Sequence, residues 1–178
     1  MSIQKATFGA GCFWCLEAAM NQLNGVIQAL SGYMGGTADS ANYNAVCSGN
    51  SGHAEVVQVE FDDSVISYEQ LCLIFFSLHD PTQLNRQGND IGSQYRSVIF
   101  THNANQQNSA EHIIATLNAE QVYTADIVTA ISPAMPFYVA EHYHQGYFQQ
   151  QPEQGYCQFI VAPKMAKFRQ RYKALLKL

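Results

Sequence analysis

The stretch IQKATFGAGCFWCLE, residues 3–17, contains the pattern that decides the fold. Residues 3–8 predict a strand, and Gly9 and Gly11 then predict a turn. Cys12 begins a helical stretch, CFWCLEAAMNQLN, that Gly25 can end. A strand, a glycine turn and a helix in close succession indicate a chain that mixes α and β structure.

Further strand-like and helix-like segments alternate along the chain. The clearest strand is HAEVVQVEF, residues 53–61, in which Val57, Val59 and Phe61 share one face. Other strands are predicted at 26–31, 96–101 and 127–131, and helices at 67–79, with Ser67 as N-cap, at 104–122, 139–148 and about 163–178. Loops are predicted at 32–52, 80–95 and 152–163. This interleaving predicts an α+β two-layer sandwich.

Length and composition predict a globular protein with its own hydrophobic core. The chain has 178 residues, the length of a single domain, and 47% of them are apolar. No stretch of about 18 apolar residues exists, which argues against a transmembrane helix. The N-terminal sequence lacks a charged segment followed by a long apolar one, so we expect a cytoplasmic protein. We expect one domain over residues 1–178 and a monomer.

Charge is distributed unevenly along the chain. Residues 1–163 contain three basic and fourteen acidic residues, and six basic residues follow residue 163. An acidic body argues against nucleic acid as a partner. In the basic C-terminal segment, Met165, Phe168, Tyr172 and Leu175 have helical spacing. This apolar stripe predicts that the segment packs on the body of the protein.

Cys12 is a candidate nucleophile, because it follows a glycine turn at the start of a helix. The partial positive charge of a helix N-terminus stabilises a thiolate. The neighbouring Phe13 and Trp14 are candidates for the lining of an apolar pocket beside the thiol. The alternative is that Cys12 and Cys15 are small core residues.

Glu55 is a candidate general acid. It has the parity of Val57 and Val59, so its carboxyl should point to the buried face of the strand. Burial without a cationic neighbour raises the pKa of a carboxyl and keeps it protonated near neutral pH. The alternative is that the end of the strand leaves Glu55 in solvent.

Three polar candidates and two cysteines lie in predicted loops. Tyr43 and Tyr95 carry phenols that can donate to an oxygen that gains charge, although ordinary packing would also explain them. Asp90 shares the second loop with Tyr95, where an Asx-turn is the simpler role. Cys157 is predicted on a mobile segment that can reach another thiol, or as an idle surface thiol. A zinc site built from Cys12, Cys15, Cys47 and His53 is disfavoured by the C-x5-H spacing.

Five motifs together resemble the A-type peptide methionine sulfoxide reductases. They cover most of the chain in the order found in that family: GCFWCLE at 11–17, SGYMGG at 31–36, YNAVCSGNSGHAEVV at 43–57, DPTQLNRQGNDIGSQYRS at 80–97 and AEHYHQGYF at 140–148. The resemblance implies an α+β sandwich with a ferredoxin-like core and a coil-rich periphery. It also implies reduction of methionine S-sulfoxide, in proteins and as the free amino acid, without a metal or an organic cofactor.

The resemblance assigns a role to each matching residue. It implies that Cys12 attacks the sulfoxide sulfur and that Glu55 gives a proton to the sulfoxide oxygen. Tyr43 and Tyr95 would hydrogen-bond that oxygen, and Asp90 would help to hold the site together. A sulfoxide oxygen leaves poorly until it is protonated, so a neutral carboxylic acid suits this chemistry.

The resemblance also implies a substrate pocket and a recycling step. Phe13 and Trp14 would hold the terminal methyl group of the substrate. Oxygen transfer would leave Cys12 as a sulfenic acid. Cys157 would then form a disulfide with Cys12, and thioredoxin, or dithiothreitol in vitro, would reduce it. Many relatives have glycine where Cys15 stands, and Cys15 is close enough in sequence to pair with Cys12 instead.

Two other functions fit part of the pattern. A thioredoxin-like dithiol oxidoreductase also has a C-x-x-C motif at a helix start, but Phe-Trp between the cysteines is unlike its usual residues. Disulfide reduction of insulin would reveal that activity. A zinc-stabilised binding module would unfold when a chelator is added.

Overall fold

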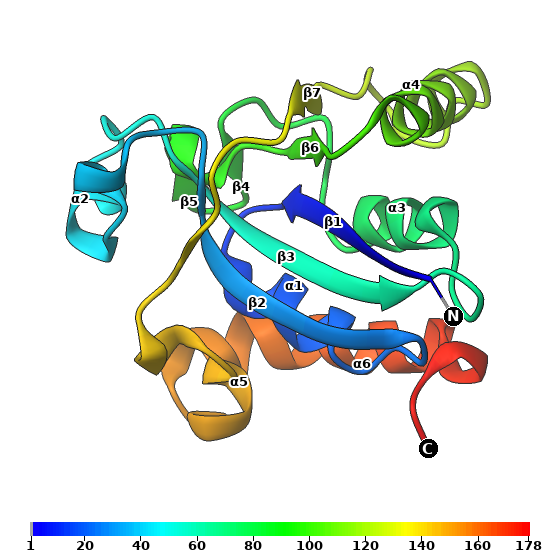
Figure 1. Cartoon of the computed structure of the whole chain (residues 1–178). Coiled ribbons are helices and arrows are strands. Elements are labelled where there is room, and N and C mark those ends of the chain that lie inside the picture. The colour runs from blue at the N-terminus through cyan, green and yellow to red at the C-terminus, as the bar shows by residue number, and fades with distance from the viewer. Residues whose placement is uncertain (1) are drawn as a thin grey trace.

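The computed structural model describes residues 2–178, and its centre is a six-stranded sheet (Figure 1). The strands follow the order β7-β6-β1-β3-β2-β8 across the sheet. Neighbours are antiparallel except β6 and β7, which are parallel. The strand bounds are β1 Ile3–Gly9, β2 Val26–Met34, β3 Ala54–Asp62, β6 Val98–Thr101, β7 Ala130–Pro133 and β8 Tyr138–Val139. The short strands β4 (Arg86–Gln87) and β5 (Asp90–Ile91) form a separate hairpin.

Within the described residues, six α-helices accompany the sheet. Their bounds are α1 Phe13–Met20, α2 Tyr43–Cys47, α3 Tyr68–Ser77, α4 Ala104–Ala119, α5 Tyr147–Gln150 and α6 Ala162–Arg171. The predicted mixture of a central sheet and packed helices is confirmed. The chain order β1-α1-β2-β3-α3-β6 follows a β-α-β-β-α-β pattern, and the finer expectation of a ferredoxin-like core stays a prediction. Within residues 2–178, no helix is both long and apolar enough to span a lipid bilayer.

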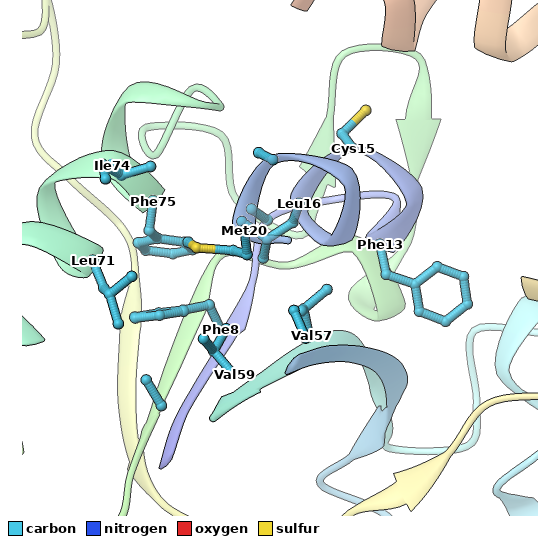
Figure 2. Packing of buried hydrophobic residues seen from close by; sticks show 14 of the residues in the cluster. Phe8, Phe13, Cys15, Leu16, Met20, Val57, Val59, Leu71, Ile74 and Phe75 are labelled. Atoms are coloured by element: carbon cyan, nitrogen blue, oxygen red, sulfur yellow. The ribbon is translucent and has the colours of Figure 1, made fainter. Parts of the chain in front are cut away.

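The main core lies between the sheet and helices α1 and α3 (Figure 2). Val57 and Val59 of β3 are fully buried there, as their alternation predicts. Phe8 of β1 stacks on Phe75 of α3 with ring centroids 4.9 Å apart. Helix α3 begins with the predicted N-cap Ser67, whose side chain forms a capping box with Gln70. This core fixes α1, and therefore Cys12, against β3.

Several element bounds differ from those predicted. Helix α1 ends at Met20, short of the predicted residue 24. Strand β2 continues to Met34 because it pairs with β3 as far as Ala54. The predicted loop 32–52 contains α2, and the loop 80–95 contains the β4–β5 hairpin. The strand predicted at 127–131 lies at Ala130–Pro133 instead.

The prediction of a helix over residues 139–148 is wrong. This segment contains the end of β8, a 3-10 turn at His142–His144 and the start of α5. The side chain of Gln145 bonds to both the backbone N–H and the carbonyl of Ser31, at 3.0 and 2.8 Å. Gly146 has a φ of 62°, in the left-handed region. Bonds to a distant strand therefore replace the helical ladder that local spacing predicts.

The prediction that residues 152–163 are irregular is wrong from residue 155 onward, where the chain is helical. Residues Cys157–Val161 form a π-helical turn that continues into α6, with Pro163 in the first turn of that helix. Cys157 is fully buried, so the prediction that it lies on a mobile loop or on the surface is wrong. The local sequence suggested a loop, but burial of Cys157 and Val161 in the main core orders it.

The C-terminal segment packs on the body, as its apolar stripe predicts. Met165 and Phe168 are buried in the main core, and Tyr172 donates a 2.7 Å hydrogen bond to Oγ of Ser77. The helix ends at Arg171, and a 3-10 turn follows at Lys173–Leu175. Figure 1 shows α6 running along the same side of the sheet as α1.

Candidate active site

A pocket of about 210 Å³ opens at the end of the sheet where β1 leads into α1. Its lining combines a thiol, two carboxyls, phenols and apolar rings: Cys12, Phe13, Trp14, Tyr43, Glu55, Asp90, Tyr95, Gln154 and Tyr156. The residues come from α1, α2, β3, β5, the 3-10 turn Ser93–Tyr95 and the C-terminal segment. The structure therefore brings seven of the eight predicted site residues to one cavity, and Cys157 is the exception.

Cys12 is the N-cap of α1 and is partly exposed to the pocket. The preceding Gly11 has a φ of 83°, and a Cβ there would lie 2.8 Å from the side chain of Gln87. Glycine is therefore needed for the tight turn that leads from the strand into the helix. This turn directs the thiol into the pocket.

The pKa of the Cys12 thiol is raised well above its usual value, contrary to the low pKa expected at a helix start. Burial is the largest cause, followed by the negative charges of Glu55 and Cys15. The backbone N–H of Trp14 lowers the pKa, but by less. The helix N-terminus lowers the pKa of Cys12 as predicted, but desolvation raises it by more.

Glu55 lies on β3 with its carboxyl buried, as its parity predicts. Its exposed fraction is 2%, and Oε1 accepts a hydrogen bond from the backbone N–H of Phe13 at 3.3 Å. Burial raises the pKa of this carboxyl from 4.5 to about 8, although the bond from Phe13 opposes the shift. Glu55 is therefore mostly protonated at neutral pH and can donate a proton within the pocket.

Tyr43 and Tyr95 line the pocket from two different elements. Tyr43 is the first residue of α2, and its backbone N–H donates to Oε2 of Glu141 at 2.9 Å. Tyr95 ends the 3-10 turn that follows the β4–β5 hairpin. Burial raises the pKa of both phenols, so both remain protonated donors at neutral pH.

Asp90 is bonded to a residue that the sequence did not single out. The hydroxyl of Tyr156 donates to Oδ2 of Asp90 at 2.6 Å, and both residues line the pocket. The ring of Tyr156 also meets that of Trp14 edge-on, with centroids 5.7 Å apart. Tyr156 lies next to Cys157 in the sequence Gly155-Tyr156-Cys157. That adjacency to a candidate site residue is the one local sign that Tyr156 belongs to the site.

Phe13 and Trp14 contribute apolar rings to the lining of the pocket. Phe13 is buried, whereas Trp14 is half-buried and stacks on Tyr147 at 3.9 Å. The indole Nε1 of Trp14 donates to Nδ1 of His144 at 3.1 Å. The orientation of Trp14 is thus fixed by a hydrogen bond and by a stacked ring.

Glu141 and His144 support the pocket from outside its lining. Besides the bond to Tyr43, Glu141 accepts a 2.8 Å hydrogen bond from the hydroxyl of Tyr33. Both supporting residues lie in AEHYHQGYF, a motif quoted above without roles for its members. Their partners lie about a hundred residues away in the chain, so local spacing carried no sign of them.

His53 and the cysteines outside the pocket have other surroundings than the disfavoured zinc site would require. The ring of His53 is occupied by the backbone N–H of Gly36 and the carbonyl of Thr37. Within the described residues, no group of three or more His, Cys, Asp or Glu side chains is arranged to bind a metal ion. Cys15 and Cys157 are both buried in the main core.

Comparison with known proteins identifies relatives along the whole chain. The sequence model of the family described as peptide methionine sulfoxide reductase matches residues 4–176. The peptide methionine sulfoxide reductase MsrA of Chromobacterium violaceum is 51% identical over 174 residues, which are 98% of this chain and 99% of that protein. The corresponding protein of Deinococcus radiodurans is 51% identical and covers 95% of this chain, and the match covers 82% of that protein.

Solved structures agree with the sequence relatives. Reduced Mxr1 from Saccharomyces cerevisiae superposes with a TM-score of 0.80 at 32% identity, over 87% of this chain and 89% of that one. A second structure shows Mxr1 in complex with Trx2, with a TM-score of 0.55 at 25% identity, over 82% and 84% of the two chains.

Proposed function

The chain belongs to the peptide methionine sulfoxide reductase family, and from this premise we propose how its pocket reduces a sulfoxide. It is an oxidoreductase that converts methionine sulfoxide to methionine. The observation that carries the mechanism is the buried carboxyl of Glu55 in one pocket with the Cys12 thiol and the rings of Phe13 and Trp14, and burial raises the pKa of that carboxyl to about 8. A thiol that attacks sulfur and an acid that protonates oxygen are the two groups that sulfoxide reduction needs.

Substrate binds with its methyl group against Phe13 and Trp14. Burial of a methyl group against aromatic rings stabilises the complex by about 0.8 kcal/mol per carbon. The orientation of Trp14 is set by His144 and Tyr147, so the apolar surface is already formed before substrate arrives. The sulfoxide oxygen then points to the polar side of the pocket, where Glu55 and the two phenols lie.

Reduction begins when the Cys12 sulfur, as a thiolate, attacks the sulfoxide sulfur. Glu55 gives its proton to the sulfoxide oxygen, while Tyr43 and Tyr95 donate hydrogen bonds to it. In balance, the Cys12 thiol and the sulfoxide become a Cys12 sulfenic acid and a thioether. The sulfoxide gains two electrons and the Cys12 sulfur loses two, so no metal or organic cofactor takes part.

Glu55 and Cys12 also influence each other's protonation. The charge of ionised Glu55 is one cause of the raised pKa of Cys12. While Glu55 keeps its proton, that cause is absent and the thiolate forms more readily. The protonated acid thus favours both the nucleophile and the departure of the oxygen.

The sulfenic acid is returned to a thiol through a disulfide that includes Cys157. Thioredoxin then reduces this disulfide, and dithiothreitol takes the place of thioredoxin in vitro. The complex of the yeast relative with Trx2 supports a partner of this kind. We propose that the S epimer is the substrate, both free and in oxidised proteins. The monomeric state, the cytoplasmic location and the limits of the catalytic domain stay predictions from the sequence.

Dithiothreitol-driven reduction of a methionine sulfoxide peptide tests this mechanism. Wild-type protein should produce methionine, and Cys12→Ser should lose all turnover because it has no nucleophile. Cys72→Ala is the matched control, because Cys72 is a buried core cysteine of α3 outside the pocket. Turnover by Cys12→Ser at the wild-type rate would overturn the assignment of the nucleophile.

A further inference from the structure

We propose that Cys15 is a relay thiol, which takes the oxidation from Cys12 and passes it to Cys157. This inference rests on the proposed function, because it begins from the Cys12 sulfenic acid. It replaces a direct reaction between Cys12 and Cys157 by two successive disulfides. The three thiols belong to two segments that the fold packs together, α1 and the helical C-terminal segment.

Cys15 is a close neighbour of Cys12 on the same helix. Cys12 is the N-cap of α1 and Cys15 is the third residue of that helix. Residues three apart on a helix have Cβ atoms about 5–6 Å apart, and a disulfide needs about 3.5–4.5 Å, so a small adjustment of the first turn joins them. The charge of Cys15 also raises the pKa of Cys12, which is a sign of the same proximity.

The Cys15 side chain points toward the C-terminal segment. In Figure 2 its sulfur lies on the side of α1 that faces away from Val57 and the sheet. Cys15 and Cys157 are both buried in the main core, with exposed fractions of 6% and 0%. The electrostatic effects also place Cys15 between the other two thiols. The charge of Cys157 raises the pKa of Cys15, whereas the charges that raise the pKa of Cys12 come from Glu55, Cys15 and Asp90.

The residue that faces the pocket from the segment Gly155-Tyr156-Cys157 is Tyr156, and not Cys157. The neighbouring Tyr156 faces the pocket and is bonded to Asp90, while the Cys157 side chain is buried in the core behind it. The backbone N–H of Cys157 is bonded to Oε1 of Gln154 at 3.1 Å, at the start of the π-helical turn. Cys15 lies with Cys157 in the main core, so a relay through Cys15 joins two core thiols and leaves the bond between Tyr156 and Asp90 in place.

Lys164 of α6 supplies a charge that suits the relay. Burial raises the pKa of Cys15 to about 11, but the ammonium of Lys164 acts in the opposite direction and favours the thiolate. The attacking species in sulfenic acid and disulfide chemistry is the thiolate. Lys164 therefore acts on the thiol with the intermediate position.

Each step balances. In the first, the Cys15 sulfur attacks the Cys12 sulfenic acid, an S–S bond forms and water leaves. In the second, the Cys157 sulfur attacks the Cys15 sulfur, the Cys12–Cys15 bond breaks and Cys12 leaves as a thiol with the proton from Cys157. A thioredoxin-type dithiol then reduces the Cys15–Cys157 disulfide and is itself oxidised to a disulfide.

The test uses the full-length reduced protein, excess methionine sulfoxide peptide and no reductant. We compare wild type, Cys15→Ser, Cys157→Ser and the control Cys72→Ala by methionine released, by dimedone labelling and by mapping of disulfides. Wild type should release a second equivalent of methionine, because Cys12 is free again once the Cys15–Cys157 disulfide has formed. Cys157→Ser should stop after one equivalent with a Cys12–Cys15 disulfide.

Cys15→Ser separates the relay from the direct route. The relay predicts one equivalent of methionine, a Cys12 that dimedone labels, and thioredoxin-driven turnover reduced at least about tenfold, with dithiothreitol-driven turnover retained. A Cys12–Cys157 disulfide in Cys15→Ser, with thioredoxin-driven turnover at the wild-type rate, would overturn the relay. If Cys15→Ser misfolds, the Cys157→Ser variant supplies the test. Absence of a Cys12–Cys15 disulfide from that variant after it has released methionine would overturn the relay equally. Absence of methionine from wild type would instead contradict the proposed function.

Discussion

The backbone N–H of Phe13 donates a 3.3 Å hydrogen bond to Oε1 of Glu55, so the general acid is tied to the residue that follows the nucleophile. The two residues are separated by 42 positions in the sequence and are brought together by the packing of α1 on β3. This contact holds the Glu55 carboxyl at the start of α1, next to Cys12.

The rise of activity with pH should stop where Glu55 loses its proton. The pKa of Cys12 is raised well above its usual value and that of Glu55 is about 8, so wild-type kcat/KM for a methionine sulfoxide peptide should rise as the thiolate forms and level off near pH 8, where each further gain in thiolate is offset by loss of the acid. Glu55→Gln keeps the shape but has no proton to give, so its kcat/KM should be lower by about 10²–10⁴-fold. A pH series with dithiothreitol measures both effects. A Glu55→Gln variant with wild-type kcat/KM would contradict the role of the acid.

The same carboxyl should make stability depend on pH. The pKa of Glu55 is raised in the folded protein, so between about 4.5 and about 8 the folded state holds a proton that the unfolded state releases. The contribution of Glu55 is thus complete below that window and is lost as pH rises through it. The free energy of unfolding of wild type, relative to Glu55→Gln, should therefore fall across this window by several kcal/mol. Parallel denaturant titrations at each pH measure the difference, and a constant difference would contradict the raised pKa.

The hydroxyl of Tyr156 should contribute to activity through Asp90. Tyr156→Phe keeps the ring against Trp14 but removes the 2.6 Å bond to the carboxylate. We expect kcat/KM to fall about five- to tenfold, which corresponds to about 1 kcal/mol for a partly exposed hydrogen bond. Tyr172→Phe loses a hydroxyl bond of similar length far from the pocket, so it should alter stability and not kcat/KM. Equal kcat/KM for Tyr156→Phe and wild type would show that the bond to Asp90 is not needed.

The C-terminal helix should stabilise the fold without taking part in the sulfoxide step. Phe168 is buried in the main core, so Phe168→Ala should lower the free energy of unfolding by about 3–5 kcal/mol. Lys167 is exposed beside it, and Lys167→Ala should change that energy by less than about 0.5 kcal/mol. At a temperature where both variants are folded, dithiothreitol-driven rates should match wild type. A large loss of rate with unchanged stability would contradict this assignment.

Local patterns predicted the parts of the site that depend on neighbouring residues. The alternation of Val57 and Val59 gave the face of Glu55, and the glycine turn before Cys12 gave the start of α1. The N-cap of α3 was also predicted, because Ser67 forms its capping box with Gln70 only three residues away. These features need only the chain geometry of one strand or one helix turn.

The features that sequence reasoning missed depend on distant partners. The bonds of Gln145 to Ser31 span 114 residues, and they replace the helix that local spacing predicted. The bond of Tyr156 to Asp90 spans 66 residues, so its presence in the pocket had no local signal beyond the adjacent Cys157. The raised pKa of Cys12 was missed for the same reason. The helix start, which lowers this pKa, is visible in the local sequence, whereas the burial that raises it depends on the folded protein.

The most direct test of the central claim is turnover of the separate S and R epimers of a methionine sulfoxide peptide with thioredoxin as reductant. Wild type and Cys12→Ser are measured side by side, and dithiothreitol replaces thioredoxin in a parallel series. The mechanism predicts that wild type reduces the S epimer alone and that Cys12→Ser reduces neither epimer. Turnover of the S epimer by Cys12→Ser, or no turnover of either epimer by wild type with both reductants, would contradict it.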